Sequence, residues 1–250
     1  MPILIDYPSP HVVLITIDNQ PKRNAMSREM MQELASCWDR LATSDCRAIV
    51  LTGAGEKAFN AGADITGDLS ANKETAQMIN RSLLKTSGYP KPIISAVNGV
   101  CAGGGVELLF STDIRLAAPH ARFGLPEVRW GIYPFGGATS KLVNQIGYVH
   151  AMKLLLTAEM IDAKKAQSIG LINDIVPAGE LIDQAVSVAA TIAANSPIAV
   201  QAVKQHISDS VAAATLARES AEQLQGDRVR ASADFSEGVN AFRRKRTPNY

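Results

Sequence analysis

Hydrophobic and polar positions follow two different periods in the first part of the chain. Aliphatic and β-branched runs at 11–17 (HVVLITI) and 47–53 (RAIVLTG) predict buried strands, and the segment between them predicts a helix over 27–42. Ser27 has the side chain of an N-cap for this helix. The apolar residues of the helix recur at helical spacing as one stripe, which is typical of a core-facing helix: Met30, Met31, Leu34, Trp38 and Leu41.

The alternation of strand and helix continues to about residue 118. The pattern predicts a polar helix at 72–87, a strand within 91–99 (KPIISAVNG), a short helix after the following glycines, and a strand at 112–118 (TDIRLAA). From Gly137 onward the strand signal nearly vanishes, apart from 171–177 (LINDIVP), and Ala-rich helical stretches occupy 180–195, 197–208 and 212–232. We therefore predict an α/β body over 1–195 and a helical region over 196–250, packed against the body or a neighbouring chain.

Composition and charge narrow the class of protein. The chain has 250 residues, 46% of them hydrophobic, with 25 basic and 24 acidic side chains, which disfavours a nucleic-acid or anionic-membrane binder. No run approaches the ~20 apolar residues of a membrane span, so we expect a cytoplasmic protein. Cys37, Cys46 and Cys101 form no CxxC pair, which predicts buried thiols in place of a disulfide framework or a zinc site.

Several well-known catalytic patterns are absent from the sequence. GAG at 53–55 follows a predicted strand, but Ala58 stands where a dinucleotide-binding G-x-G-x-x-G needs its third glycine. No Gly-Lys-Ser or Gly-Lys-Thr of a phosphate loop occurs, and no G-x-S-x-G of a serine hydrolase. The four histidines lie far apart without an i, i+4 pair, so we expect no metal site.

Two glycine-containing segments, FNAGADI at 59–65 and CAGGGVE at 101–107, each carry an acidic residue. Glycine inside an element costs about 0.5–1 kcal/mol relative to alanine, so these runs indicate close approach of the backbone to something. Both place unpaired N–H groups at a loop or helix start, where they can hold an oxyanion. Singly, Asp64, Glu107 and Glu127 have ordinary structural explanations as a cap, a first-turn acid and a loop acid. Together they favour a catalytic site.

At this point the sequence resembles the crotonase superfamily, in particular the enoyl-CoA hydratases, over nearly its whole length. The resemblance lies in these segments: NQPKRNAMS (19–27), AFNAGADI (58–65), KPIISAVNGVCAGGGVEL (91–108), TDIRLAA (112–118), FGLPEVRWGIYP (123–134) and AFRRKR (241–246). It implies a spiral of repeated β-β-α units with a C-terminal helical region, assembled as a homotrimer or a dimer of trimers.

The resemblance also implies a substrate and a site. The substrate is an acyl-CoA thioester, and no separate cofactor is needed. The amides of Ala63 and Gly104 are expected to form an oxyanion hole. Hydratases of this kind carry two glutamates, matched here by Glu107, expected as the base, and Glu127, expected as the acid. The alternative is an isomerase, or another crotonase-type acyl-CoA reaction, that uses only Glu127. The presence of both acids disfavours a non-catalytic scaffold.

The sequence departs from the family at two positions. Phe135 stands where the hydratases have a glycine facing the acyl pocket, and Thr66 stands where a lysine is common. Contacts to CoA and substrate are expected from the segment Ala61 to Ile65, which includes Asp64, and from Phe135. Arg23 and Lys245 are the candidates for the CoA phosphates. The basic end AFRRKRTPNY has two interpretations, a solvated terminus or part of an anion-binding surface.

Overall fold

The computed structural model describes residues 2–64 and 73–250, so the predicted contact at Ile65 and the departure at Thr66 lie outside the described residues. Within this part of the chain the larger of two sheets has the strand order β1-β2-β3-β5-β7-β10. Its strands are β1 (Ile3–Ser9), β2 (Val12–Ile17), β3 (Ala48–Gly53), β5 (Ile93–Val97), β7 (Ile114–Ala117) and β10 (Asp174–Ile175). β1 is antiparallel to β2, and all later neighbours are parallel.

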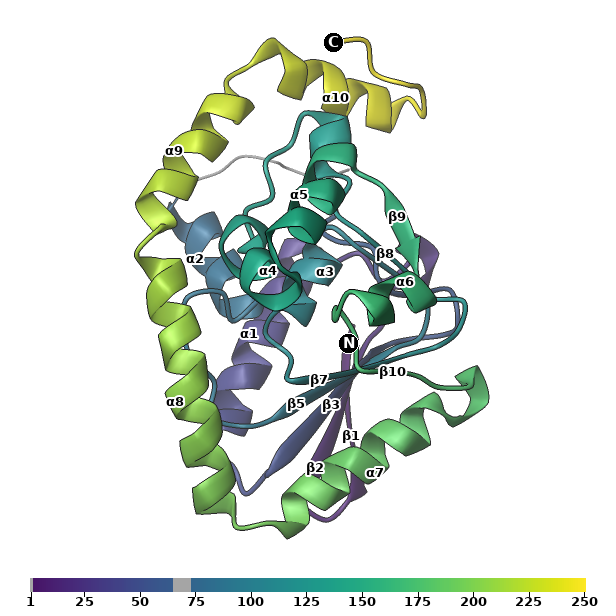
Figure 1. The fold of residues 1–250 in the computed structure, drawn as a ribbon, viewed down its shortest axis with the longest axis vertical. Helices are drawn as coiled ribbons and strands as arrows, with labels where there is room; N and C mark the ends of the chain where they lie inside the picture. Colours follow the sequence, from purple (N-terminus) through teal and green to yellow (C-terminus); the bar gives the residue numbers. More distant parts are fainter. Residues whose placement is uncertain (1, 65–72) are drawn as a thin grey trace.

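Alternate residues of these strands contact different layers of the fold. Val50, Ile94 and Leu116 pack against helix α7 (Leu181–Ala194), whereas Ile49 and Ile93 belong to the main core on the other side, with helix α1 (Arg28–Ala42). Because side chains alternate along a strand and both faces are covered, the central strands read as continuous apolar runs. Figure 1 shows α7 along one side of the sheet and α1 on the opposite side.

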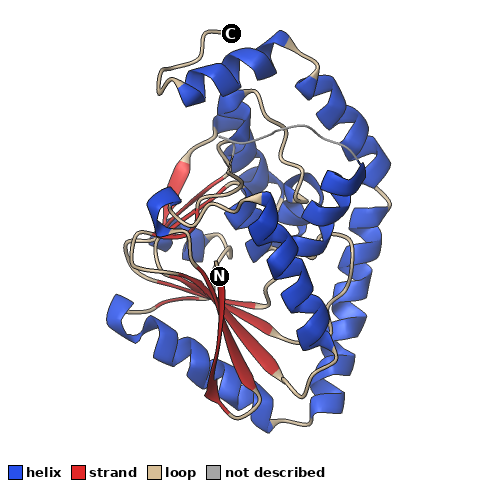
Figure 2. Cartoon of the chain, turned by 180° about the vertical axis from the view of Figure 1, so that it is seen from behind, coloured by secondary structure: helices blue, strands red, loops and turns tan. Residues whose placement is uncertain are grey.

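A smaller sheet has the order β4-β6-β8-β9, and it explains the repeated unit of the fold. Its strands are β4 (Ala58–Asn60), β6 (Val100–Ala102), β8 (Arg122–Gly124) and β9 (Met160–Asp162). β4, β6 and β8 each follow a strand of the larger sheet, and each precedes a helical segment: α2 (Lys73–Ser82), α3 (Gly104–Leu109) or the 3₁₀ turn η2 (Glu127–Trp130). The repeated β-β-α units implied by the resemblance are therefore present (Figure 2).

The remaining helices pack around the body (Figure 1). They are α4 (Ala138–Ile146), α5 (Tyr148–Thr157) and α6 (Ala163–Ser168), followed after α7 by α8 (Pro197–Leu216), α9 (Glu219–Arg230) and α10 (Ala233–Arg243). In Figure 1, α8 and α9 run along one side of the body and α10 crosses its upper end. In the described chain no single helix meets the length and hydropathy of a membrane span, and only α7 with its preceding turn plus α8, bent by 108°, do so together.

Some predicted boundaries were wrong. The polar helix expected to reach residue 87 ends at Ser82, because the chain turns at Leu84 (φ 46°) and buries Leu83 and Leu84 in the core. The two stretches expected at 197–208 and 212–232 are divided elsewhere. α8 continues to Leu216, helped by an i, i+4 hydrogen bond from Gln205 to Asp209, and α9 begins only at Glu219. The strands β1, β4, β6, β8 and β9 were not predicted.

The helix predicted at 27–42 and the buried thiols are confirmed. Ser27 accepts a hydrogen bond from the Met30 amide as the N-cap of α1, and the five residues of its apolar stripe are buried. Cys37, Cys46 and Cys101 are buried, free thiols.

Candidate active site

The three glycines of CAGGGVE have three different structural reasons. Gly103 is the N-cap of α3 with φ 55°, a conformation that favours glycine, and a Cβ there would lie 3.1 Å from Oε1 of Glu127. Gly105 packs directly against the carbonyl of Asn60, which leaves no room for a side chain. A Cβ on Gly104 would meet only ordinary contacts, the nearest being the Ala63 nitrogen at 3.6 Å. The face of Gly104 is therefore open towards Ala63.

The FNAGADI segment directs the Ala63 amide towards the same space. Gly62 has φ 95°, and Ala63 forms an isolated parallel bridge with Met26. In that bridge the Met26 amide donates to the Gly62 carbonyl at 2.9 Å, and the Asp64 amide donates to the Met26 carbonyl at 2.9 Å. Because the peptide groups on either side of Ala63 face Met26, its own N–H points away from Met26.

The amides of Ala63 and Gly104 thus flank one space. Gly104 is the first residue of α3, where an N–H has no partner within the helix. Among the described residues, neither amide donates a hydrogen bond. Two such N–H groups beside one space have the geometry required to bind a single oxygen atom that gains negative charge.

Two glutamates reach the space beside these amides from different units of the fold. Glu107 lies in the first turn of α3, is 5% exposed and accepts a hydrogen bond from the Ala138 amide at 3.3 Å. Gly136 packs directly against its carboxyl group. Glu127 begins η2, and its Oε2 is buried without a hydrogen-bond partner in the described part of the chain. An unpartnered buried carboxylate oxygen is costly, and it points to a role towards a ligand.

Burial raises the pKa of both carboxyl groups. Loss of solvation is the main cause for Glu107, and the negative charge of Glu127 raises its pKa further. Loss of solvation also raises the pKa of Glu127. Since the two groups interact, they titrate as a pair, and adding the second negative charge is disfavoured. The pair therefore tends to keep a proton at neutral pH, when an ordinary glutamate has lost its own.

A cavity of about 260 Å³ contains the two amides and both carboxyl groups. Ala61, Ala63, Gly104, Glu107, Glu127 and Phe135 all line it, so six of the predicted site residues lie together. Asp64 lines an adjoining hollow of about 150 Å³ and forms an ion pair with Lys22 at 2.6 Å. Arg23 and Lys245 line neither space. Both are exposed, Arg23 after the turn η1 (Gln20–Lys22) and Lys245 after α10.

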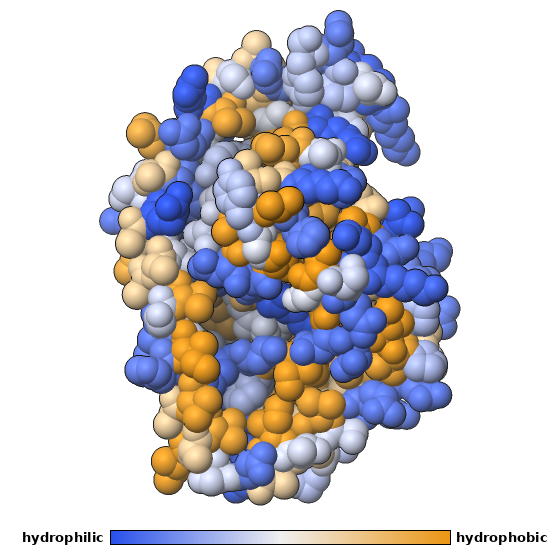
Figure 3. Space-filling model, viewed as in Figure 1, coloured by the Kyte–Doolittle hydropathy of each residue, from blue (hydrophilic) through white to orange (hydrophobic). Residues whose placement is uncertain are grey.

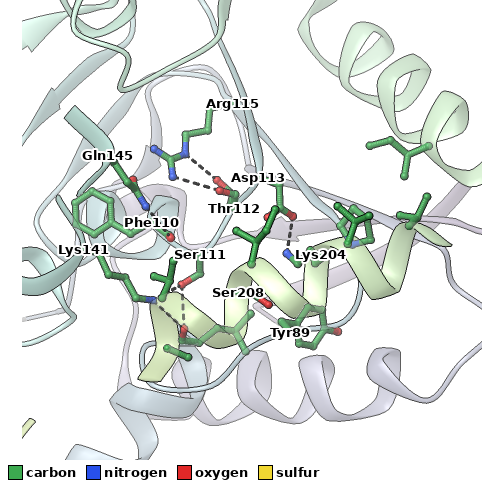
Figure 4. Close-up of a pocket in the computed structure, with 18 of the residues that line it drawn as sticks. Tyr89, Phe110, Ser111, Thr112, Asp113, Arg115, Lys141, Gln145, Lys204 and Ser208 are labelled. Atoms are coloured by element: carbon green, nitrogen blue, oxygen red, sulfur yellow. Dashed lines mark hydrogen bonds and ion pairs between the residues drawn. The ribbon is translucent and has the colours of Figure 1, made fainter. Parts of the chain in front are cut away.

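A larger cavity, of about 780 Å³, lies between α8 and the body but offers no comparable chemistry. Lys204 forms an ion pair with Asp113, and Lys141 donates to the Leu84 carbonyl and the Ser111 hydroxyl (Figure 4). Arg115 donates to the Thr112 hydroxyl and carbonyl and to the Leu171 carbonyl. The charged side chains of this larger cavity are thus occupied by protein partners. Its described lining contains neither of the Ala63 and Gly104 amides and neither of the two glutamates.

Helices α9 and α10 form one wall of the cavity that contains the two glutamates, and they pack against the elements around it. Trp130 of η2 packs edge-on against Phe242 of α10, with ring centroids 5.2 Å apart. On α9, Glu222 accepts a hydrogen bond from Thr139 at 2.9 Å and forms an ion pair with the buried Lys85. Lys85 also contacts Glu219 at 2.7 Å. These contacts fasten the C-terminal helices over the site.

Sequence reasoning missed the contribution of α9 and α10 to this cavity. Gly226, Val229 and Arg230 of α9 line it, as do Phe235 and Phe242 of α10. The only available signal was the spacing of Glu222, Gly226 and Arg230 at i, i+4 and i+8, which places them on one face of a helix. No group of three or more metal-ligating side chains occurs among residues 2–64 and 73–250.

Comparison with known proteins places the chain in a family. The model of the enoyl-CoA hydratase/isomerase family matches residues 9–250, and the chain belongs to that family. It is 38% identical to the enoyl-CoA hydratase EchA19 of Mycobacterium tuberculosis, over 96% of this chain and 93% of that protein. It is 33% identical to the 2,3-dehydroadipyl-CoA hydratase of Escherichia coli, over 96% of this chain and 94% of that protein.

Solved structures agree with this assignment. The crystal structure of carnitinyl-CoA hydratase from Mycobacterium avium matches with a TM-score of 0.90 and 32% identity, covering 100% of this chain and 98% of that one. The fold is that of the crotonase superfamily, and the protein is an enoyl-CoA hydratase-like enzyme. The names of these relatives include different acyl groups, so family membership alone does not select the substrate.

Proposed function

We propose that this enzyme adds water to a 2-enoyl-CoA thioester, or removes it in the reverse direction. The observation that carries the proposal is that one cavity contains two amides and two buried carboxyl groups. The N–H groups of Ala63 and Gly104 donate to no described acceptor. The carboxyl groups are those of Glu107 and Glu127. Water addition requires one group that accepts a proton and one that donates a proton. A buried pair that retains one proton meets both needs.

The proposed steps begin with the thioester oxygen bound between the two amides. The pair shares one proton, which favours Glu107 in the free protein, and the proposed reactive form is the one with this proton on Glu127. In that form Glu107, as the carboxylate, takes a proton from water while the water oxygen forms its bond to C3. The electrons of the C2=C3 bond move towards the thioester oxygen, and the amides stabilise the resulting enolate. Glu127, as the acid, then gives its proton to C2. Both carboxyl groups are proposed to act on the same face of the C2=C3 bond, so that water adds in the syn sense.

The test is a spectroscopic assay of the purified protein with crotonyl-CoA and longer enoyl-CoAs. Loss of the enoyl absorbance, with a 3-hydroxyacyl-CoA as product, is the expected result. Migration of the double bond without uptake of water would assign the protein to the isomerases. A flat trace with every substrate, from a folded protein, would contradict both reactions.

We propose that the CoA portion leaves the cavity along Ala61 and Asp64, with Arg23 as a phosphate contact. The Ala61 amide donates to the Arg23 carbonyl at 3.1 Å, which holds the exposed Arg23 beside this segment. Lys245 is the second phosphate candidate. Its left-handed backbone (φ 53°) follows directly after α10, close in the chain to Phe242 of the cavity wall.

Replacing Phe135 by Gly is expected to change acyl preference more than CoA affinity. The ring lines both hollow spaces and packs against Gly226, so its removal joins and widens them. Volume changes of this kind alter relative kcat/KM by roughly 10- to 200-fold. The measurement is kcat/KM for short, branched, aromatic and long enoyl-CoAs on both proteins. An unchanged ranking would show that Phe135 serves only packing.

We also propose that the protein assembles as a homotrimer or a dimer of trimers. α8 exposes Ile198, Val203, Ile207 and Leu216 at 83%, 64%, 61% and 58%, and an apolar stripe follows this helix in Figure 3. Contiguous exposed apolar surface of this kind marks interaction sites. Light scattering at micromolar concentration is expected to give three or six times the 26.7 kDa chain mass. A monomer at that concentration would contradict the prediction.

The raised pKa of Glu107 predicts how stability depends on pH. Its pKa is about 8 in the folded protein, against 4.5 ordinarily. A group whose pKa is raised on folding makes its full contribution to the free energy of unfolding below its unfolded-state pKa. That contribution is lost as the pH rises through the folded-state pKa. Glu107→Gln stays neutral at every pH. The difference in Tm between this variant and the wild type is therefore expected to increase by a few °C, in favour of the variant, as the pH rises from about 6 to about 9.

The matched control is Glu180→Gln, at an exposed carboxylate before α7. Its Tm difference from the wild type is expected to stay constant over the same range. A pH-independent difference for Glu107→Gln as well would show that this carboxyl is not protonated in the folded protein.

A further inference from the structure

Arg230 is the one basic side chain among the described residues that line the cavity with the two glutamates. It also lines the adjoining hollow, beside Ile79 and Phe135. Apart from Glu107, Glu127 and Arg230, the described lining of the cavity carries no charge. Its side chain is 25% exposed, so the guanidinium is partly solvated while it borders this cavity.

Packing by other residues fixes where the guanidinium lies. Its carbon lies 4.7 Å from the centroid of the Phe135 ring, as a cation–π contact. The Phe135 ring itself fits against Gly226, one helical turn before Arg230, where even a Cβ would collide with it. Phe135, the residue that departs from the family, therefore acts as a platform for Arg230 at the cavity wall.

The protein uses only part of the hydrogen-bonding capacity of Arg230. Nη1 donates to Asp227 at 2.8 Å, and no other hydrogen bond of this guanidinium occurs in the described chain. Asp227 has a side chain 55% exposed, and such surface pairs contribute little. Stacking on Phe135 occupies a face of the guanidinium, while the N–H donors lie along its edge. These edge donors are suited to a planar anion.

Neither glutamate of the cavity is the ion-pair partner of Arg230. The nearest buried acid on the same face of α9 is Glu222, which already pairs with Lys85 and accepts from Thr139. Glu222 lies eight residues from Arg230, about 12 Å along the helix at 1.5 Å per residue. Both residues line the adjoining hollow, where the charge of Glu222 is compensated by Lys85.

We propose that Arg230 binds a carboxylate on the acyl group, so that the preferred substrates are enoyl-CoA thioesters with a second, distal carboxylate. This inference rests on the proposed function, because it places the thioester between Ala63 and Gly104 and the reacting carbons beside the glutamates. The acyl group then extends past Phe135 to the guanidinium edge. Arg and carboxylate form bidentate, charge-assisted hydrogen bonds, which bind and orient the ligand.

The experiment compares substrates that differ only at the acyl end. A series of enoyl-CoAs of increasing chain length ends either in a carboxylate or in its uncharged carboxamide, and kcat/KM is measured for each pair. For the wild type, the ratio of carboxylate to carboxamide is expected to exceed one and to pass through a maximum at one length. A ratio below one at every length would overturn the proposal.

The variants are Arg230→Gln and, as the matched control on the same helix, the exposed Arg228→Gln. Arg230→Gln is expected to lower the carboxylate-to-carboxamide ratio roughly 10- to 100-fold, the range for a hydrogen bond to a charged group. Arg228→Gln is expected to leave the ratio unchanged. Equal losses on both substrates in Arg230→Gln would assign Arg230 to CoA binding or packing and overturn the proposal.

Failure here is distinguishable from failure of the proposed function. If uncharged enoyl-CoAs are hydrated but no carboxylate preference exists, only the role of Arg230 is wrong. If no enoyl-CoA of either series gains water, the hydratase assignment itself is contradicted. Circular dichroism and the oligomeric mass of each variant, compared with the wild type, establish that the fold is retained.

Discussion

Glu107→Gln is expected to lower kcat for hydration of the preferred enoyl-CoA by about 10²- to 10⁴-fold, the usual contribution of a general acid or base. The glutamine keeps the size of the side chain and can still accept the hydrogen bond from the Ala138 amide. It cannot take a proton from water. Because the substitution leaves the proposed thioester site at the two amides unchanged, KM is expected to change much less than kcat.

Glu127→Gln completes this test, since the proposed acid and base act on the same substrate. Each single variant is expected to lose most of the activity, and the double variant little more, because residues that act as a unit are not additive. Glu180→Gln, at an exposed position, should retain wild-type rates. Hydration at a near wild-type rate by Glu107→Gln would remove it as the base. An isomerase mechanism through Glu127 alone would leave Glu107→Gln active in double-bond migration.

The periodicity of the sequence predicted the central strands and α1 because these elements are long and buried in a regular pattern. Strands β2, β3, β5 and β7 consist almost entirely of buried residues, which gives continuous aliphatic runs. The strands of the smaller sheet have three residues each, too few to show a period of two. Periodicity alone therefore indicated an α/β protein but not the two sheets of the spiral, which only the resemblance supplied.

In the candidate site, too, some residues could be found from local sequence and others could not. Local sequence marked Gly104 and Glu107, because consecutive glycines beside an acid need a reason, and the structure places both on the cavity. Arg230 has no local signal beyond its helical spacing from Glu222 and Gly226, since it lies in an Ala- and Gln-containing helix beside several other charges. Its position depends on how α9 folds back over Phe135, about 95 residues earlier in the chain. Contacts between such distant segments cannot be deduced from spacing along the chain.

Gly104→Pro is expected to reduce turnover by about 10²- to 10³-fold, the cost of removing one donor from an oxyanion hole. Proline lacks the N–H, and the Gly104 amide is the donor proposed for the enolate oxygen. The first position of a helix is the one that tolerates proline best, and the Gly104 nitrogen donates to no described acceptor. The measurement is kcat and kcat/KM for the preferred enoyl-CoA, with the oligomeric mass checked against the wild type.

Gly104→Ala gives an independent test of the same space, because it keeps the N–H but adds a methyl group 3.6 Å from the Ala63 nitrogen. That methyl group enters the space between the two amides where the thioester oxygen is proposed to bind, so this variant is expected to lose substrate affinity as well as rate. Gly179→Ala is the matched control, since a Cβ there meets nothing within 4 Å. If both Gly104 variants remain folded and turn over at near wild-type rates, the Ala63 and Gly104 amides do not bind the reacting oxygen, and the oxyanion hole must be sought elsewhere in the cavity.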